Sequence, residues 1–168
     1  ALDPINKLLE NGREMNVALI GMGGAGKAIW AFLNKKFKYL HKLTAFNRSI
    51  IRGSGKQSNL ADVSRLREFE QSISDFDLII NATSAGSSND LNSAPFNLDL
   101  LNNTKPGCII YDIIYDPLKT KLLLVSESCG LKTINGLRMN MVQAVLAYKY
   151  TNSTKLSLEQ VFKTMEDH

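Results

Sequence analysis

A glycine-rich run between apolar residues constrains the fold of this chain more than any other feature. It spans residues 16–29, with the sequence NVALIGMGGAGKAI. The residues from Val17 to Ile20 are all apolar, which predicts a strand with both faces buried in a parallel sheet. Behind the glycines, apolar residues recur every three or four positions and predict one face of a helix; they are Ala25, Ala28, Ile29, Phe32, Leu33 and Phe37. The run therefore predicts a strand, a tight loop and a helix.

The spacing of the glycines indicates what this loop binds. Gly21, Gly23 and Gly26 match the G-x-G-x-x-G fingerprint of dinucleotide-binding folds. The first glycine permits the turn, the second lets a pyrophosphate approach the backbone, and the third lets helix and strand pack closely. The helix N-terminus adds unpaired N–H groups and a positive dipole end. We expect the whole loop to hold the cofactor phosphates: Gly21, Met22, Gly23, Gly24, Ala25 and Gly26.

A second interpretation of the same letters is a triphosphate-binding loop. Residues 21–27 also fit G-x-x-x-x-G-K, and residues 108–112 form an apolar run that ends in a candidate magnesium-holding aspartate, Asp112. That loop continues with a Ser or Thr whose hydroxyl binds Mg²⁺. Ala28 stands there and has no ligand atom. The sequence therefore favours the dinucleotide over the triphosphate.

The end of the next predicted strand, residues 43–46, discriminates between the two nicotinamide cofactors. NAD-binding folds place an Asp or Glu there for the ribose 2′-OH, whereas an Arg accommodates the 2′-phosphate of NADP. This strand end carries no acid, but Arg48 follows it and Arg52 lies close behind. A guanidinium can pair bidentately with phosphate, where a carboxylate would repel it. The alternative is two solvated surface arginines, and the missing acid favours NADP(H).

The rest of the chain alternates between strand and helix patterns. Buried strands are expected at 77–83, 108–114 and 132–135, and helices at 96–101, 120–125 and 138–150. Residues 1–14 predict an entering helix or linker. Within 152–168, a capping box of Ser157 and Gln160 starts a C-terminal helix. Residues 54–74 fit either a helix or an edge strand. This alternation predicts a single α/β domain over residues 1–168, a doubly wound, mostly parallel sheet of the Rossmann type.

Composition and charge exclude several other classes of protein. The formal net charge of +4 is spread along the chain, so nucleic-acid binding is not indicated. No apolar stretch is long enough to cross a membrane, and no signal peptide is evident. Two cysteines predict packing residues rather than a disulfide framework, and two isolated histidines predict no metal site. We expect a cytoplasmic protein.

Five motifs, taken in order, resemble the NADP-binding domain of shikimate dehydrogenase over nearly the whole chain. They are the glycine loop of residues 21–26, Asn47-Arg48-Ser49, Asn81-Ala82-Thr83, the D-x-x-Y-x-P-L-K-T run of residues 112–120, and N-G-L-R-M at 135–139 with Gln143-Ala144. Departures from the family pattern are Ser84 and Ser87 near the third motif, where the family usually has Pro and Met, and Lys121, where it usually has Pro.

The resemblance implies roles for particular residues. Asn47, Arg48 and a following Ser49 or Arg52 would hold the ribose phosphate of the adenosine. Residues along the nicotinamide ribose and ring would be Thr83, Ser84, Ile114, Gly136 and Met139. Tyr115 and Gln143 would face shikimate from the cofactor side of the cleft. The implied parent activity is the NADPH-dependent reduction of 3-dehydroshikimate to shikimate, an oxidoreductase step of chorismate and aromatic amino-acid biosynthesis.

The resemblance also implies what this chain lacks. In the family, an N-terminal domain supplies most of the substrate site and the catalytic Lys/Asp pair, and no residue here matches that pair by motif. We therefore expect a cofactor-binding domain that is inactive alone. A quinate/shikimate dehydrogenase relative or a non-enzymatic NADP-sensing module would share these motifs. The sequence indicates no oligomeric state.

Overall fold

The sheet of this protein is entirely parallel in the computed structural model, which describes residues 5, 14–35, 40–48, 63–152 and 156–166. Its strand order is β3-β2-β1-β4-β5-β6. The strands are Met15–Ile20 (β1), Leu40–Asn47 (β2), Val63–Arg65 (β3), Leu78–Asn81 (β4), Ile109–Asp112 (β5) and Lys132–Ile134 (β6). The order reverses between β1 and β4, the position where open α/β sheets bind ligands. The predicted doubly wound α/β fold is confirmed.

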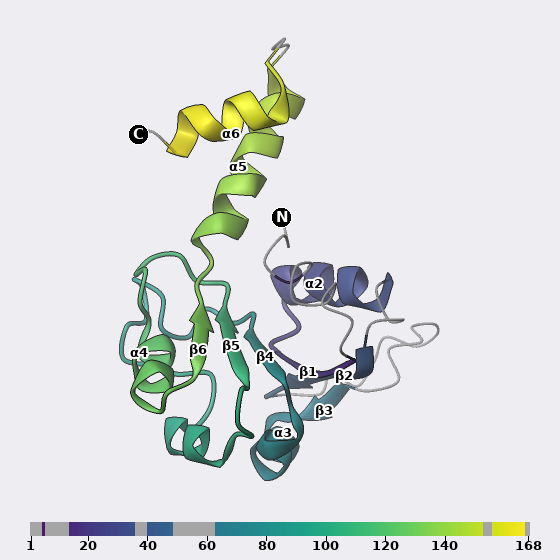
Figure 1. The fold of residues 1–168 in the computed structure, drawn as a ribbon, viewed down its shortest axis with the longest axis vertical. Helices are drawn as coiled ribbons and strands as arrows, with labels where there is room; N and C mark the ends of the chain where they lie inside the picture. Colours follow the sequence, from purple (N-terminus) through teal and green to yellow (C-terminus); the bar gives the residue numbers. More distant parts are fainter. Residues whose placement is uncertain (1–4, 6–13, 36–39, 49–62, 153–155, 167–168) are drawn as a thin grey trace.

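Helices cover both faces of this sheet (Figure 1). Helix α2 packs on one face, and helices α3 and α4 pack on the other. The helices are α2 (Gly24–Lys35), α3 (Leu66–Ser72), α4 (Lys121–Ser128), α5 (Leu137–Thr151) and α6 (Leu158–Glu166), with 3-10 turns η2 (Ile73–Asp75) and η3 (Leu98–Asn103). The short helix predicted at 96–101 is therefore a 3-10 turn displaced by two residues.

Alternation along β1 divides the core in two. Val17 and Leu19 point to the α2 face, while Ala18 and Ile20 point to the α3 and α4 face. All four are at most 2% exposed, as the uninterrupted apolar run predicts. On the second face, phenylalanines from β2, α3 and the loops pack ring against ring, with centroids 4.9–6.0 Å apart. These two layers hold the carboxyl ends of the strands in fixed register.

The apolar face of α2 differs from the predicted one. Ala25 and Ala28 are exposed, and the buried residues are Gly26, Ile29, Trp30 and Leu33. The three- and four-residue spacing predicted that the two alanines are buried, but Trp30 is buried instead. In the first turn of α2 it is Gly26, between the two alanines, that packs against the end of β1, where a Cβ would collide with the Gly21 carbonyl.

The ambiguous stretch contains both predicted structures. Val63–Arg65 pairs in parallel with the end of β2 as the edge strand β3, and α3 begins at the next residue. The alternating run of residues 65–69 is therefore helical after Arg65. Phe69 is its buried anchor, with no exposed surface. Residues 49–62 lie outside the described part of the chain.

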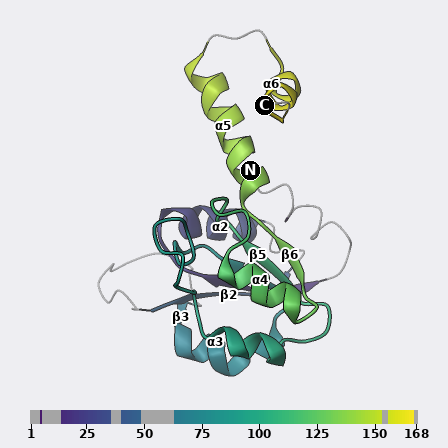
Figure 2. The ribbon, with the colours of Figure 1, turned by 90° about the vertical axis from the view of Figure 1, so that its left-hand side faces the viewer.

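The last two helices form a hairpin that extends away from the sheet (Figure 2). The first turn of α5 is anchored by Met139, and α6 packs mainly against α5. The predicted capping box is present: the N–H of Gln160 donates to Ser157 Oγ at 3.1 Å, and the N–H of Ser157 donates to Gln160 Oε1 at 2.8 Å. The helix expected in residues 1–14 falls almost wholly outside the described residues. No helix in the described part is long and apolar enough to cross a membrane.

Candidate cofactor site

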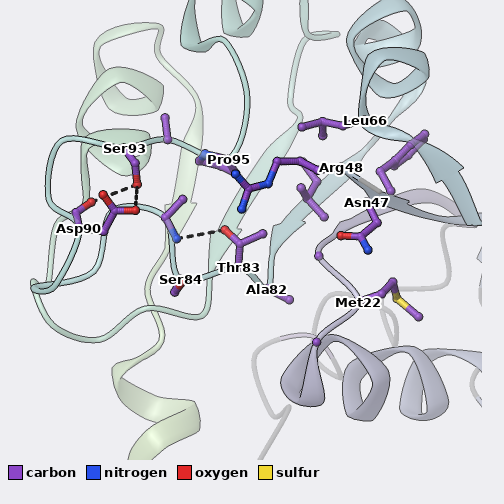
Figure 3. A pocket seen from close by; sticks show the side chains of 16 residues that line it. Met22, Asn47, Arg48, Leu66, Ala82, Thr83, Ser84, Asp90, Ser93 and Pro95 are labelled. Carbon is purple, nitrogen blue, oxygen red and sulfur yellow. Dashed lines mark hydrogen bonds between the residues drawn. The ribbon is translucent and has the colours of Figure 1, made fainter. Parts of the chain in front are cut away.

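A crevice of about 350 Å³ opens where β1, β2 and β4 end (Figure 3). The glycine loop forms one wall, the end of β2 a second, and the loop after β4 a third. Its lining residues are Ile20, Gly21, Met22, Gly23, Phe46, Asn47, Arg48, Leu66, Ala82, Thr83, Ser84, Ala85, Asp90, Ser93, Ala94 and Pro95. Seven of them belong to the predicted cofactor set, so the fold brings these distant parts of the sequence together.

The glycines of the loop serve two different purposes. Gly21 has φ +94°, and a Cβ there would lie 2.7 Å from Thr83 Cγ2; a Cβ on Gly26 would collide with the Gly21 carbonyl. Gly21 excludes a side chain through its positive φ and its contact with Thr83, and Gly26 does so because the backbone of Gly21 is packed against it. Nothing lies within 4 Å of a Cβ built on Gly23 or Gly24. The middle of the loop therefore leaves open space at the helix N-terminus, the end of a helix at which anions bind.

Hydrogen bonds to both neighbouring strands fix the loop. The N–H of Gly21 donates to the Phe46 carbonyl of β2, and the N–H of Ala82 donates to the Ile20 carbonyl, both at 2.8 Å. Within α2, the N–H of Lys27 reaches back to the Gly23 carbonyl. The N–H groups before Lys27 lie in the first turn, whose orphan donors a helix offers to ligands. The exposure of Gly23, Gly24 and Ala25 agrees with that role.

Asn47 and Arg48 sit where the prediction places the ribose phosphate. Asn47 is the last residue of β2 and is partly buried, whereas Arg48 is exposed. Figure 3 shows the Arg48 side chain reaching across the crevice toward Pro95, with Asn47 on the side of the glycine loop. No acid stands at this strand end. Ser49 and Arg52, the other predicted members, lie outside the described residues.

The loop after β4 contributes residues that the motif analysis missed. Thr83 and Ser84 line the crevice as predicted, and Asp90, Ser93 and Pro95 follow them from the same loop. The loop is folded on itself: the N–H of Gly86 donates to the Asp90 carbonyl at 3.1 Å and to Ser93 Oγ at 3.2 Å. In the sequence, the only indication of this wall was the run of small residues 84–88 that follows β4. Its tip could not be predicted without knowing how the loop closes.

A buried polar network lies behind this wall. The Asp112 carboxylate, with no exposed surface, accepts hydrogen bonds from Asn81 Nδ2 (3.0 Å), the Ile114 N–H (3.1 Å) and Thr120 Oγ1 (2.7 Å). Burial raises the pKa of Asp112, and these hydrogen bonds oppose the rise. Because its oxygens are occupied in the core, Asp112 does not project into the crevice as a magnesium ligand would. The geometry thus counts against the triphosphate-binding interpretation.

A second cluster of predicted residues lies beside β5 and the start of α5. The N–H of Gly136 donates to the Ile114 carbonyl at 2.9 Å, and a Cβ on Gly136 would collide with the Ile113 carbonyl. Gly136, Ile114 and Met139 are all buried. None of the three lines the 350 Å³ crevice, so the structure groups them apart from the phosphate loop. Tyr115 is 48% exposed beside them, and Gln143 is exposed on α5.

Among the described residues, no His or Cys lines the crevice. The described residues hold no cluster of three or more His, Cys, Asp or Glu side chains that could bind a metal. His41 is exposed, 3.8 Å from Glu14, and far along β2 from the crevice. Burial raises the pKa of the Cys108 thiol to about 12, so this cysteine is neutral at physiological pH. Cys129 is partly buried.

Comparison with known proteins gives a consistent result. No protein-family model matches the chain. A shikimate dehydrogenase (NADP(+)) from Bacillus licheniformis is 34% identical over 151 residues, which cover 88% of this chain and 52% of that protein. Its counterpart from Methanococcus vannielii is 31% identical over 166 residues, with 89% and 56% covered. The chain matches the C-terminal, NADP-binding part of the shikimate dehydrogenases.

The solved structures agree with this assignment. Shikimate dehydrogenase 1 from Peptoclostridium difficile superimposes with a TM-score of 0.76 at 25% identity, over 98% of this chain and 59% of that one. The chain spans about half the length of the curated shikimate dehydrogenases it matches. The family resemblance expected from the five motifs is confirmed. The individual site residues stay predictions.

Proposed function

We propose that this chain is the NADP(H)-binding domain of a shikimate dehydrogenase. The observation that carries the proposal is the crevice, in which a loop with open positions at Gly23 and Gly24, at a helix N-terminus, faces Arg48 beside a strand end without an acid. The open positions at Gly23 and Gly24 suit a pyrophosphate, and Arg48 suits a ribose 2′-phosphate. The residues present therefore fit the dinucleotide. That the relatives are NADP(+) enzymes supports this choice.

The proposed reaction is the reversible reduction of 3-dehydroshikimate to shikimate. Bound NADPH supplies a hydride to the ketone carbon, while a general acid protonates the oxygen. On this chain, Ile114, Gly136 and Met139 would hold the nicotinamide. Tyr115 and Gln143, both exposed beside these residues, contact the substrate from the cofactor side. The Lys/Asp pair belongs to the part of the family's proteins that this chain does not match.

Two related functions fit the same crevice. A quinate/shikimate dehydrogenase would use this cofactor site, with its substrate choice made in the other domain. An NADP-sensing module would bind the cofactor without chemistry. The relatives favour the enzyme over the sensor. The cytoplasmic location stays a prediction.

Calorimetric titration of the chain with NADP⁺, NAD⁺ and ATP·Mg²⁺ tests the proposal. We expect the tightest binding for NADP⁺, because Arg48 meets a phosphate that NAD⁺ lacks. Arg48→Ala should weaken NADP⁺ binding by about ten- to hundredfold, since hydrogen bonds to charged groups contribute roughly 1.5–3 kcal/mol. Binding of NAD⁺ should change little in that variant.

A matched control removes the same charge at the other end of β2, the strand that Arg48 follows. Lys42 lies near the amino end of β2, is exposed and does not line the crevice. Lys42→Ala should leave NADP⁺ binding within about twofold, which shows that the loss in Arg48→Ala is local rather than a net-charge effect. Binding of ATP·Mg²⁺ without NADP⁺ would reject the dinucleotide site altogether.

A further inference from the structure

Burying the Asp112 carboxylate costs free energy that a purely structural residue at this position would not need to cost. Its carboxylate has no exposed surface, and none of the causes of its pKa shift is a neighbouring cation among the described residues. Burying a charge without an opposite charge is costly, and a neutral side chain would fill the same space more cheaply. The three donors around the carboxylate reduce that cost but do not explain why it is placed there. The places in the fold from which the three donors come explain why a carboxylate stands there.

The donors come from the two loops that form the walls of the nicotinamide half of the site. Asn81 ends β4, and Ile114 follows β5. With Asn81 Nδ2 committed to Asp112, the Asn81 Oδ1 atom faces Thr83 and accepts from both its N–H (3.0 Å) and its hydroxyl (2.7 Å). Thr83 Oγ1 in turn accepts from the Ala85 N–H at 3.2 Å. One carboxylate thereby sets the orientation of an amide and of a threonine that lines the crevice.

The same carboxylate connects to the loop after β5. Its Oδ1 atom also holds the Ile114 N–H, while its Oδ2 atom holds Thr120, which caps α4. Thr120 also lies close to the β4 loop, because a Cβ built on Gly86 would be 3.4 Å from the Thr120 Cβ. The N–H of Ser88 donates to the Asp116 carbonyl at 3.0 Å. Hydrogen bonds therefore join the two segments at Asn81–Asp112 and at Ser88–Asp116, and Thr120 lies beside Gly86 between them.

We infer that Asp112 is a positioning residue that holds Thr83 and Ile114 in register on the two sides of the nicotinamide. This inference rests on the proposed function and deepens it. Asp112 itself touches neither crevice nor cofactor; it acts through the Asn81 amide and the Ile114 N–H. The hydrogen bonds named above reach neither the glycine loop nor Arg48, so we expect the adenosine half of the site to respond less to Asp112 than the nicotinamide half.

Binding of NADP⁺ compared with adenosine 2′,5′-bisphosphate separates the two halves, because the bisphosphate lacks the nicotinamide. In Asp112→Leu we expect NADP⁺ affinity to fall by about tenfold or more, the effect of leaving buried donors unsatisfied. The affinity for the bisphosphate should stay within about twofold of the unaltered chain. Thermal melting of each variant reports whether the fold survives.

Two milder variants keep the test decisive if Asp112→Leu does not fold. Asp112→Asn retains an oxygen for Asn81 and Ile114, and its amide can donate to the Thr120 hydroxyl, so it should preserve both affinities. Thr120→Val removes one donor from Asp112 and should weaken NADP⁺ alone, whereas Thr120→Ser should not.

The outcomes are distinct. Selective loss of NADP⁺ affinity in Thr120→Val or Asp112→Leu, with recovery in the Ser and Asn variants, supports the inference. Parallel loss of both compounds, or no loss in any variant, overturns it while leaving the proposed function intact. If the unaltered chain bound neither compound, the proposed function would fail, and this inference with it.

Discussion

At the scale of single residues, four glycines in one loop divide into two pairs. Gly21 and Gly26 are required by close contacts within the protein. A Cβ on Gly23 or Gly24 would have no atom of the described structure within 4 Å. The G-x-G-x-x-G spacing predicted the first group and Gly23 from known uses of each position. Gly24 lies outside that spacing, and only the structure shows that its Cβ would be equally free of contacts. The open space at Gly23 and Gly24 is therefore where we expect the ligand to approach the backbone.

This division can be tested with two alanine substitutions. Gly26→Ala places a methyl group against the Gly21 carbonyl and should cost about 1–3 kcal/mol of stability, as overpacking does. For a chain of this size the melting temperature should fall by several degrees. Gly23→Ala should melt like the unaltered chain and lose NADP⁺ affinity instead. Equal melting temperatures for the two variants would contradict the division.

At the scale of elements, the sequence predicts best where the period is unambiguous and the burial complete. β1, β4 and β5 were predicted within a few residues because their apolar runs are buried on both faces. The buried face of α2 differs from the predicted one, because Trp30 is buried and Ala28 is not. The periodicity of a single helix does not tell which of its turns lie over the sheet. Residues 63–72 change from strand to helix between Arg65 and Leu66. Segments this short contain too few residues for their apolar period to distinguish a strand from a helix.

The helix α6 provides the test at this scale. Ser157→Ala removes the side-chain oxygen that accepts the Gln160 N–H and should cost about 1 kcal/mol. Because α6 packs mainly against α5, we expect local opening rather than global unfolding. Amide hydrogen exchange in residues 161–164 should speed up about fivefold, with the sheet unchanged. Thr164→Ala, whose hydroxyl bonds a helix carbonyl instead, is the control and should have little effect. Faster exchange throughout the sheet would mean that α6 is coupled to the core.

At the scale of the whole molecule, the fold and the cofactor wall were predictable and the linkage between loops was not. Motifs at Gly21–Gly26, Arg48 and Thr83 lie at strand ends, and a parallel sheet must gather strand ends on one edge. The Asp112 network joins residues separated by up to 39 positions. It depends on side-chain orientation after each strand, which the apolar pattern does not encode.

The whole-molecule prediction concerns catalysis. The chain alone should bind NADP⁺ yet show no shikimate oxidation above a blank without enzyme, because it positions the cofactor without most of the substrate pocket. Absorbance of NADPH at equilibrium with excess shikimate measures this directly. Turnover by the chain alone would contradict it and place the missing acid and base among the residues described here.

The two clusters of predicted cofactor residues are also separated in time during synthesis. The phosphate loop and Arg48 leave the ribosome first, whereas Gly136 and Met139 emerge about ninety residues later. The third wall of the crevice, residues 82–95, emerges between them, so a nascent chain can complete the crevice about forty residues before it reaches Gly136. Because Gly136 packs against the Ile113 carbonyl, the residues predicted to hold the nicotinamide come together only when β6 and the first turn of α5 have docked. NADP⁺ would thus stabilise the completed domain in preference to its folding intermediates.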